Sequence, residues 1–230
     1  MMEQFKINEI IYRYIADAVS CTVEQLQQEG TFFVMNEKRT KEYIKVLSIK
    51  DTNIISLSED KYEIGKSLLT GKNRDELYES SLIFGQTIHY VPNVKNMQMK
   101  PFPTEYKFTM YENHELVNLK GIKGFDNSLV FDEDGHTDTN IVLCALQDDT
   151  VLAIASASYV TETIMEVGID VKKEYRGRGL ASLLVTNLTS VLLDEGKVPF
   201  YSASVTNLAS QAVAVRGGYM PLWTDSYGVR

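Results

Sequence analysis

The sequence predicts an α/β protein with a mixed, mostly antiparallel central sheet and flanking helices, preceded by an α/β amino-terminal region. Three β-rich segments, residues 141–146, 151–160 and 164–171, follow one another with only short polar turns between them, as in an antiparallel meander. A long helix then precedes an alternation of strand, helix and strand, which is typical of helices packed on a sheet. At ~150 residues per domain, 230 residues correspond to one core with a large extension or to two small units.

The boundary between the two parts is expected in residues 90–103, which hold three of the five prolines: Pro92, Pro101 and Pro103. Residues 1–104 then form the amino-terminal α/β region, whose role the sequence does not identify. Residues 105–230 form the second domain.

In the amino-terminal region, apolar residues at helical spacing predict a helix from Ile7 to Ala18. Thr22 and Gln25 have the spacing of a capping box for a short second helix, which Gly30 would end. Beyond it we expect strands at 31–35 and 53–57 with a helix over Thr40–Leu47 between them, then helices at 61–69 and 74–84.

In the second domain we expect a strand at 106–111, a helical stretch near 114–120 and a polar loop at 126–140. The run Ile141–Leu146 is apolar on both faces, which predicts a buried central strand. Apolar residues from Leu180 to Leu192 predict one face of a long helix that Gly196 ends. A strand at 198–204, a helix at 207–216 and a last strand or hairpin at 219–227 follow.

Charge and composition exclude several classes of partner. The chain carries 23 basic and 31 acidic residues, a net charge of −8, so we expect neither nucleic acid nor an anionic membrane as partner. Its longest apolar run is far below the ~18 residues of a membrane span, and the charged amino terminus is unlike a secretory signal. Cys21 and Cys144 lie far apart without metal-ligand spacing, so we expect a reduced, cytoplasmic protein.

The most informative segment joins the third meander strand to the long helix. Gly177 and Gly179 would let the backbone approach a ligand, and the start of the helix offers unpaired N–H groups that can hold phosphate. Four bases add counter-charge for more than one phosphate: Lys172, Lys173, Arg176 and Arg178. The segment lacks the Gly-Lys-Ser/Thr of a P-loop, and Ser182 replaces the third glycine of the dinucleotide fingerprint.

At these residues the sequence resembles the GCN5-related N-acetyltransferase (GNAT) superfamily, whose pyrophosphate motif Arg/Gln-x-x-Gly-x-Gly/Ala matches Arg176, Gly179 and Ala181. Asn207 and the pair Gly218-Tyr219 occupy further family positions, so the resemblance covers roughly residues 105–230. It is closest to a bacterial subgroup with an amino-terminal extension. It implies the acyl-CoA N-acyltransferase fold and acetyl-CoA as co-substrate, without a metal.

The resemblance also implies a cofactor-binding set. Backbone groups of Ile169, Asp170 and Val171 would pair with the pantetheine arm, Asn207 would bond it near the thiol, and Arg176 would face the phosphates. The pyrophosphate would lie on the N–H groups of Gly177, Arg178, Gly179, Leu180, Ala181 and Ser182. Asn207 could equally be a helix N-cap.

For catalysis, Glu166 is the best candidate for the general base, with Asp170, of the same strand parity, as the second choice. A tyrosine that serves as general acid in many family members is replaced by Ala214. Tyr201, Ser202 and Ser204 could substitute for it, whereas Tyr219 occupies a structural aromatic position. Covalent catalysis by Cys144 is disfavoured, because a thiolate is costly inside an apolar strand.

These features predict an N-acetyltransferase that moves an acetyl group from acetyl-CoA to an amine by direct attack in a ternary complex. The alternative is a CoA-binding protein that senses or regulates without turnover. We expect a small-molecule or peptide amine as acceptor, and a cationic one because of the acids in the 112–140 segment: Asp132, Glu133, Asp134 and Asp138. His89, His114 and His136 are scattered, so we expect no metal, and a homodimer is left open.

Overall fold

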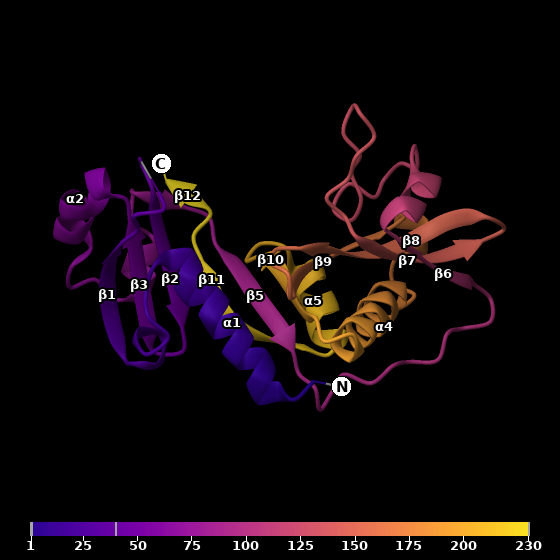
Figure 1. Ribbon diagram of the computed structural model, residues 1–230, viewed down its shortest axis with the longest axis horizontal. Helices are drawn as coiled ribbons and strands as arrows, with labels where there is room; N and C mark the ends of the chain where they lie inside the picture. The colour runs from indigo at the N-terminus through magenta and orange to yellow at the C-terminus, as the bar shows by residue number, and fades with distance from the viewer. Residues whose placement is uncertain (1, 40, 230) are drawn as a thin grey trace. The chain divides into compact units, whose positions relative to one another are not determined.

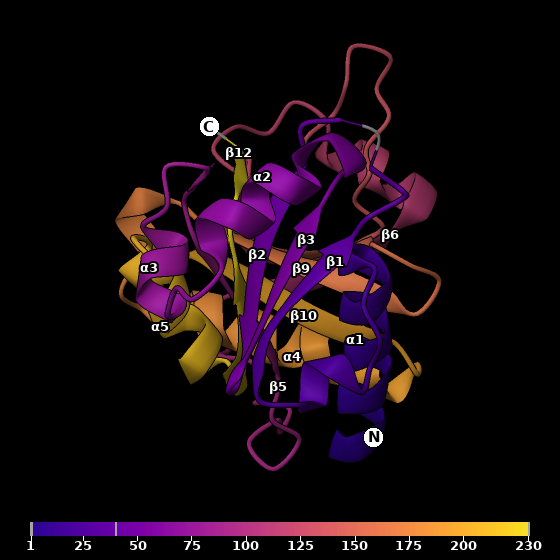
Figure 2. The same ribbon diagram turned by 90° about the vertical axis from the view of Figure 1, so that its left-hand side faces the viewer.

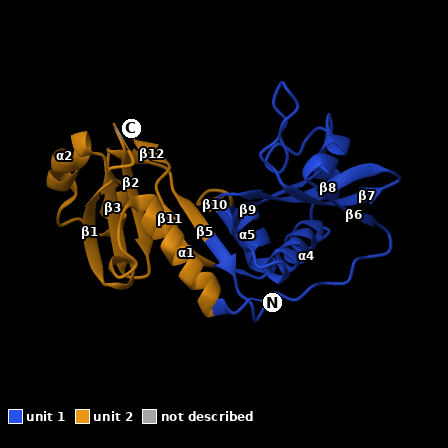
Figure 3. Ribbon diagram, viewed as in Figure 1, with its two compact units in different colours: residues 1–4, 90–202, 208–220 blue, residues 5–89, 203–207, 221–230 orange. Residues whose placement is uncertain are grey.

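The computed structural model describes residues 2–39 and 41–229. The chain separates into two compact units, which Figure 3 shows in different colours. Unit 1 holds Met1–Gln4, Tyr90–Ser202 and Leu208–Met220, and unit 2 holds Phe5–His89, Ala203–Asn207 and Pro221–Arg230. Each unit therefore contains segments from both ends of the chain.

Unit 2 is built on a small sheet in the strand order β1-β3-β2, with the unit 2 part of β11 beside β2. Figure 2 shows β1, β3 and β2 side by side. The elements of this part of the chain are α1 (Gln4–Val19), a 3₁₀ turn (Gln25–Gln27), β1 (Gly30–Met35), β2 (Ile44–Ile49), β3 (Thr52–Leu57), α2 (Glu59–Leu69), α3 (Arg74–Tyr78), β4 (Ile83–Phe84) and β12 (Gly228–Val229). Strand β1 is parallel to β3, and β2 is antiparallel to both β3 and β11.

Three expectations for this region are wrong. The helix expected over Thr40–Leu47 is strand β2, and Thr40 itself lies outside the described residues. The helix expected at 74–84 ends at Tyr78, after which Ile83 and Phe84 form β4. The Thr22–Gln25 capping box is present, but it precedes only a 3₁₀ turn, and Gly30 begins β1.

Unit 1 contains the expected meander. Its sheet has the order β10-β9-β8-β7-β6, with antiparallel neighbours except for the parallel pair β9 and β10. Its elements are β6 (Lys107–Glu112), the 3₁₀ helix η2 (Asn113–Leu119), β7 (Ile141–Gln147), β8 (Thr150–Tyr159), β9 (Ile164–Val171), a 3₁₀ turn (Lys173–Tyr175), α4 (Leu180–Asp194) and α5 (Leu208–Arg216). Strands β5 (Thr87–Pro92), β10 (Val198–Ser204) and β11 (Tyr219–Asp225) have residues in both units. The prediction of a mixed, mostly antiparallel sheet with flanking helices is confirmed.

The two faces of the meander are covered differently. Figure 1 shows α4 on one side of these strands and the segment containing η2 on the other. On the η2 side, Ile154 of β8 and Cys144 of β7 pack with Phe125 and Leu129 in an apolar cluster. The residues that alternate with Ile154 on β8 are Ala153, Ala155 and Ala157, all completely buried. Small side chains there leave room for α4 to pack closely on β7, β8 and β9.

Candidate functional site

Strands β9 and β10 of the unit 1 sheet separate partway along their length. They pair over four positions, from Ile164 opposite Val198 to Val167 opposite Tyr201. Strand β9 then continues to Val171, while the described part of the chain places no residue of β10 opposite Gly168 or beyond. The sheet therefore opens between these strands, and one edge of β9 is exposed over its last residues.

Backbone geometry shows which groups face that opening. The Lys172 N–H donates to the Leu152 carbonyl at 2.9 Å, so these residues form a hydrogen-bonded pair of β8 and β9. Hydrogen-bonded and non-hydrogen-bonded pairs alternate in antiparallel strands. Ile169 and Val171 accordingly direct their backbone groups away from β8 and toward the opening. Those of Asp170, opposite Ile154, point at β8.

The turn after β9 leads to the start of α4, as the sequence predicts. Gly177 and Gly179 have φ angles of +77° and +81°, a conformation that favours glycine. A Cβ atom added at either would meet no atom within 4 Å, so the space above both is open. The first hydrogen bond of α4 runs from Leu183 N–H to Gly179 at 3.0 Å. The N–H groups of Leu180, Ala181 and Ser182 come before it and have no acceptor within the helix.

Among the basic side chains of this turn, Lys173, Arg176 and Arg178 are exposed and Lys172 is half-buried. The Arg176 Nε donates to the Val171 carbonyl at 3.0 Å, so the guanidinium lies beside the exposed edge of β9. Arg178 lies 4.8 Å from the centre of the Tyr175 ring, and Lys172 lies 5.9 Å from that of Phe125. These arrangements leave charged N–H donors free for phosphate oxygens. Asn207 is exposed and directly precedes α5.

Glu166 lies on β9 at the end where β9 and β10 are still paired. It is opposite Ser158 of β8, and its carboxylate accepts a hydrogen bond from the Ser202 hydroxyl of β10. Glu166, Gly168 and Asp170 share one face of β9, because the β8–β9 register is continuous over these residues. This is the face that carries η2 and the 126–140 loop.

The other proposed proton donors and nucleophiles differ in their surroundings. Tyr201 is buried, its hydroxyl lies 2.6 Å from the Ser210 Oγ, and burial raises its pKa. Tyr219 is buried against Thr189, and burial raises its pKa. Burial also raises the pKa of Cys144 to about 12, so this side chain is a neutral thiol at physiological pH. Ala214 is completely buried.

Asp170 has a contact that the sequence did not suggest. Its carboxylate accepts hydrogen bonds from the Asn127 backbone N–H at 2.9 Å and from the Asn127 side-chain amide at 2.8 Å. The two residues are far apart in the sequence, and no motif marks Asn127. Asp170 and Asn127 meet because the 126–140 loop crosses β9, and this path cannot be read from the sequence.

The acidic loop rises from the same face of the sheet. At its base, the Ser128 hydroxyl donates to the Ile154 carbonyl and Thr139 donates to Ser128, while Asn140 bonds the backbone of β8. Its five acids are exposed: Asp126, Asp132, Glu133, Asp134 and Asp138. The hydrogen bond from the His136 N–H lowers the pKa of Asp132. Ligand atoms of Asp132, Asp134 and His136 lie within 4.8 Å of one another at the exposed tip.

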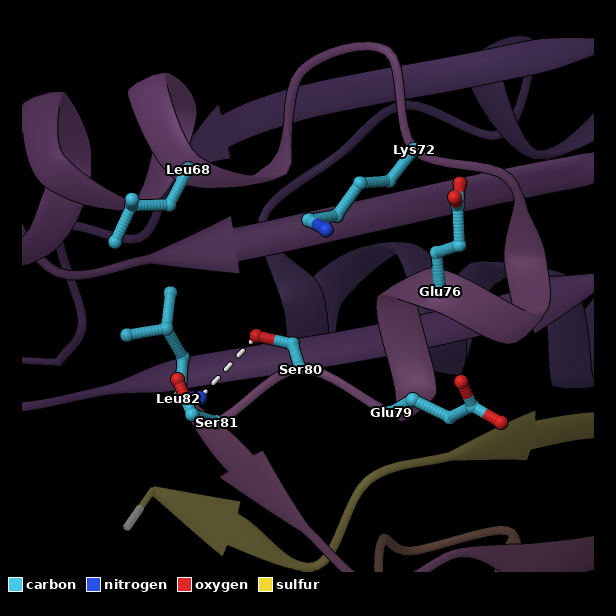
Figure 4. A pocket seen from close by; sticks show the side chains of 7 residues that line it. All are labelled: Leu68, Lys72, Glu76, Glu79, Ser80, Ser81 and Leu82. Carbon is cyan, nitrogen blue, oxygen red and sulfur yellow. Dashed lines mark hydrogen bonds between the residues drawn. The ribbon is translucent and has the colours of Figure 1, made fainter.

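A pocket of about 380 Å³ lies in unit 2, apart from the residues described above. It is lined by Leu68, Lys72, Glu76, Glu79, Ser80, Ser81 and Leu82 (Figure 4). Glu76 is already engaged in the capping box of α3 with Asn73. None of the residues expected to bind a cofactor or to catalyse lines this pocket.

His89, Met97 and Met99 differ in how far they are buried. His89 stacks on Trp223, with ring centroids 4.4 Å apart, and lies 3.1 Å from Asp225. Met97 is completely buried, whereas Met99 is exposed. Among residues 2–39 and 41–229, no helix is long and apolar enough to cross a membrane.

Comparisons with known proteins agree with these features. Residues 131–222 match the family model of the GNAT acetyltransferases. No curated protein matches the sequence.

Several solved structures are similar to the chain. A GCN5-related N-acetyltransferase-like protein from Streptococcus suis is 18% identical, with 86% of this chain and 87% of that chain covered and a TM-score of 0.49. An acetyltransferase of the GNAT family from Colwellia psychrerythraea is 14% identical, with 66% and 58% covered and a TM-score of 0.45. A tandem GNAT protein from the clavulanic acid biosynthesis pathway is 15% identical, with 76% and 59% covered and a TM-score of 0.49. The matched part spans less than two thirds of the last two proteins.

Proposed function

The chain carries a GNAT acetyltransferase domain, matched over residues 131–222, and from this premise we propose that it transfers the acetyl group of acetyl-CoA to an amine in a ternary complex. The observation that carries the proposal is the opening between β9 and β10 next to a glycine-bearing helix start. An exposed strand edge and a phosphate-binding turn are the two features that a pantetheine arm with a pyrophosphate needs.

The residues present fit acetyl-CoA. Gly177 and Gly179 leave open space beside the unpaired N–H groups of Leu180, Ala181 and Ser182, which can hold the pyrophosphate with Arg176 and Arg178. On the exposed edge of β9, Ile169 and Val171 are better placed than Asp170 to pair with the pantetheine amides. Asn207 stays a candidate for a contact near the thiol.

Bound acetyl-CoA supplies an activated thioester, so this chain has to bind, orient and move a proton. We propose that the Glu166 carboxylate accepts the proton of the attacking amine, directly or through a water molecule, and that Ser202 orients it. A backbone N–H at the β9 edge would stabilise the oxyanion. Since Tyr201 and Tyr219 are buried and position 214 is alanine, we propose that the departing thiolate takes its proton from solvent.

The acceptor is proposed to be cationic. Four exposed acids of the 126–140 loop, Asp132, Glu133, Asp134 and Asp138, stand on the sheet face that carries Glu166, and such a charge would raise the local concentration of an amine substrate. Polyamines, aminoglycosides and lysine side chains share this chemistry.

Two further proposals concern the part of the chain that carries the chemistry and the compartment in which the protein acts. All the proposed site residues lie in residues 105–230, so we assign the chemistry to that domain and none to residues 1–104. The free thiols of Cys21 and Cys144 fit a reducing compartment, and we propose that the protein acts in the cytoplasm.

The decisive experiment measures thiol release from acetyl-CoA with a panel of cationic, neutral and anionic amines. Amine-dependent release that is fastest with the cationic members is the expected result. Binding of acetyl-CoA in calorimetry without release for any amine would instead identify a protein that binds CoA without turnover, which Ala214 would explain.

A further inference from the structure

The Asn127 turn, residues 126–128, lies against a defined stretch of β9. Along that strand, Gly168 and Asp170 lie between Glu166 and the turn that begins at Lys172, and all three of Glu166, Gly168 and Asp170 share one face. The Asn127 turn covers this face at Gly168 and Asp170. Along β9, the Asn127 turn therefore lies between the proposed base, Glu166, and the phosphate-binding turn.

Gly168 shows how closely the Asn127 turn approaches. A Cβ atom built there would lie 2.6 Å from the Asn127 carbonyl oxygen and 2.9 Å from the Ser156 Oγ. Backbone this close leaves no room for any side chain larger than hydrogen. The φ angle of Gly168 is not positive. Glycine is therefore needed here because of the lack of space and not because of an unusual backbone conformation.

Asp170 fixes the Asn127 turn in this position. Its two carboxylate oxygens accept the backbone N–H and the side-chain amide of Asn127, at 2.9 and 2.8 Å, so that both position and orientation are set. Hydrogen bonds to a charged acceptor are stronger than those between neutral groups. Phe125, just before the turn, and Ser128, its last residue, are buried, which holds the turn at both ends.

We propose that Asp170 is a positioning residue of the acetyltransferase, which holds the Asn127 turn as one wall of the passage between Glu166 and the bound cofactor. This inference rests on the proposed function. Its side chain is occupied by Asn127 and its backbone by β8, so Asp170 acts neither as the base nor through its backbone on the pantetheine. An acceptor amine then meets the thioester only from the Glu166 side, with the turn limiting its approach.

The first test measures the contact itself by amide hydrogen exchange in the full-length protein. In Asp170→Ala, exchange of the Asn127 amide should become about tenfold faster or more, because that N–H loses a charged acceptor. Asp170→Asn, which keeps one acceptor oxygen, should give an intermediate value. Asp148→Asn, which removes an exposed charge from the turn between β7 and β8, is the matched control, with unchanged exchange of the Asn127 amide.

The second test measures the consequence for turnover. In Asp170→Ala, kcat/KM for the acceptor amine should fall about tenfold while the Kd for acetyl-CoA is unchanged. Gly168→Ala should displace the Asn127 turn by a steric clash, without altering Asp170. It should likewise lower kcat/KM for the acceptor and leave the Kd for acetyl-CoA unchanged. Asn127→Ala should have its effect in the wild-type background and little in Asp170→Ala, because the two residues act as a unit.

These outcomes separate the two proposals. Unchanged exchange in Asp170→Ala overturns the contact, and faster exchange with unchanged acceptor kinetics overturns the positioning role. If the wild-type protein releases no thiol with any amine, the proposed function fails, and the exchange measurements still decide whether Asp170 holds the Asn127 turn.

Discussion

Val167 of β9 and Tyr201 of β10 are the last residues of a parallel strand pair that face each other, and past them the sheet opens. Glu166 therefore lies at the end of the opening where β9 and β10 still pair. The Gly177–Gly179 turn lies at the other end, after β9. A ligand that lies along β9 would therefore span from the proposed base to the start of α4. The predictions below test the two ends separately.

Gly179→Val should abolish the binding of acetyl-CoA. The side chain would fill the open space at the start of α4, and a φ angle of +81° strains any β-branched residue. Isothermal titration calorimetry measures the loss directly. Gly196→Val is the matched control, because Gly196 has a φ angle of +78° and open surroundings near the other end of the same helix. Equal affinity in wild type and Gly179→Val would remove the phosphate assignment.

Arg176→Ala should weaken the binding of acetyl-CoA by about 1–3 kcal/mol, the range of a charge-assisted hydrogen bond. The loss is smaller than for Gly179→Val because the helix-start N–H groups remain. Affinities measured at low and at physiological salt should differ less in the variant than in wild type. Arg13→Ala, which removes an exposed base of α1, is the control and should change neither value.

Glu166→Gln should lower turnover by a factor of ~10²–10⁴, because an amide cannot accept the amine proton. Affinity for acetyl-CoA should stay close to that of wild type, since Glu166 lies away from the phosphate turn. Steady-state kinetics and calorimetry on the same preparation separate the two effects. Glu162→Gln, in the exposed turn before β9, serves as the control. A Glu166→Gln enzyme as fast as wild type would contradict the assignment of the base and favour catalysis by solvent alone.

Neutralising four acids of the 126–140 loop together should flatten the salt dependence of turnover. In wild type, kcat/KM for a cationic acceptor should fall as salt rises, because exposed charges are screened within ~8–10 Å at physiological ionic strength. The variant combines Asp132→Asn, Glu133→Gln, Asp134→Asn and Asp138→Asn. Asp148→Asn with Asp149→Asn, in the β7–β8 turn, should leave the salt response in place. A quadruple variant with the full wild-type response would show that the loop does not attract the acceptor.

Cys144→Ala should retain turnover. Burial raises the pKa of Cys144 to about 12, so between pH 7 and 9 the folded protein holds a neutral thiol there. Removing a buried sulfur atom should lower the free energy of unfolding by ~1–2 kcal/mol, measured by urea denaturation. Iodoacetamide should label Cys144 only after unfolding. Loss of turnover in a fully folded Cys144→Ala protein would reopen covalent catalysis.

The sequence was most informative where local pattern and tertiary structure agree. The meander, α4 and the glycine turn follow from alternation, helical spacing and residue type, so all were predictable. Strand β2 was missed because Tyr43, Val46 and Leu47 also fit a helical spacing. Pairing with β3 on one side and β11 on the other decides its conformation, and the β11 residues come from the far end of the sequence.

The side-chain contacts of the candidate site were less predictable than its backbone. Glu166 and Ser202 meet because of the β9–β10 register, which no local signal specifies. Asp170 and Asn127 meet because a long loop folds back across β9. Motifs therefore located the phosphate turn, while the surroundings of the two carboxylates depended on long-range geometry.

Unit 2 is made of three segments that are far apart in the sequence, and this affects the order in which the protein can fold during synthesis. Residues 5–89 are synthesised well before the other segments of unit 2, 203–207 and 221–230. The Ser226 N–H bonds Val46, Tyr227 bonds Phe84, and β12 pairs with β4. Unit 2 thus cannot be completed until residues 221–230 have been synthesised. During that interval one side of β2 has no strand beside it, so nascent chains should depend on chaperones for longer than the position of residues 5–89 suggests.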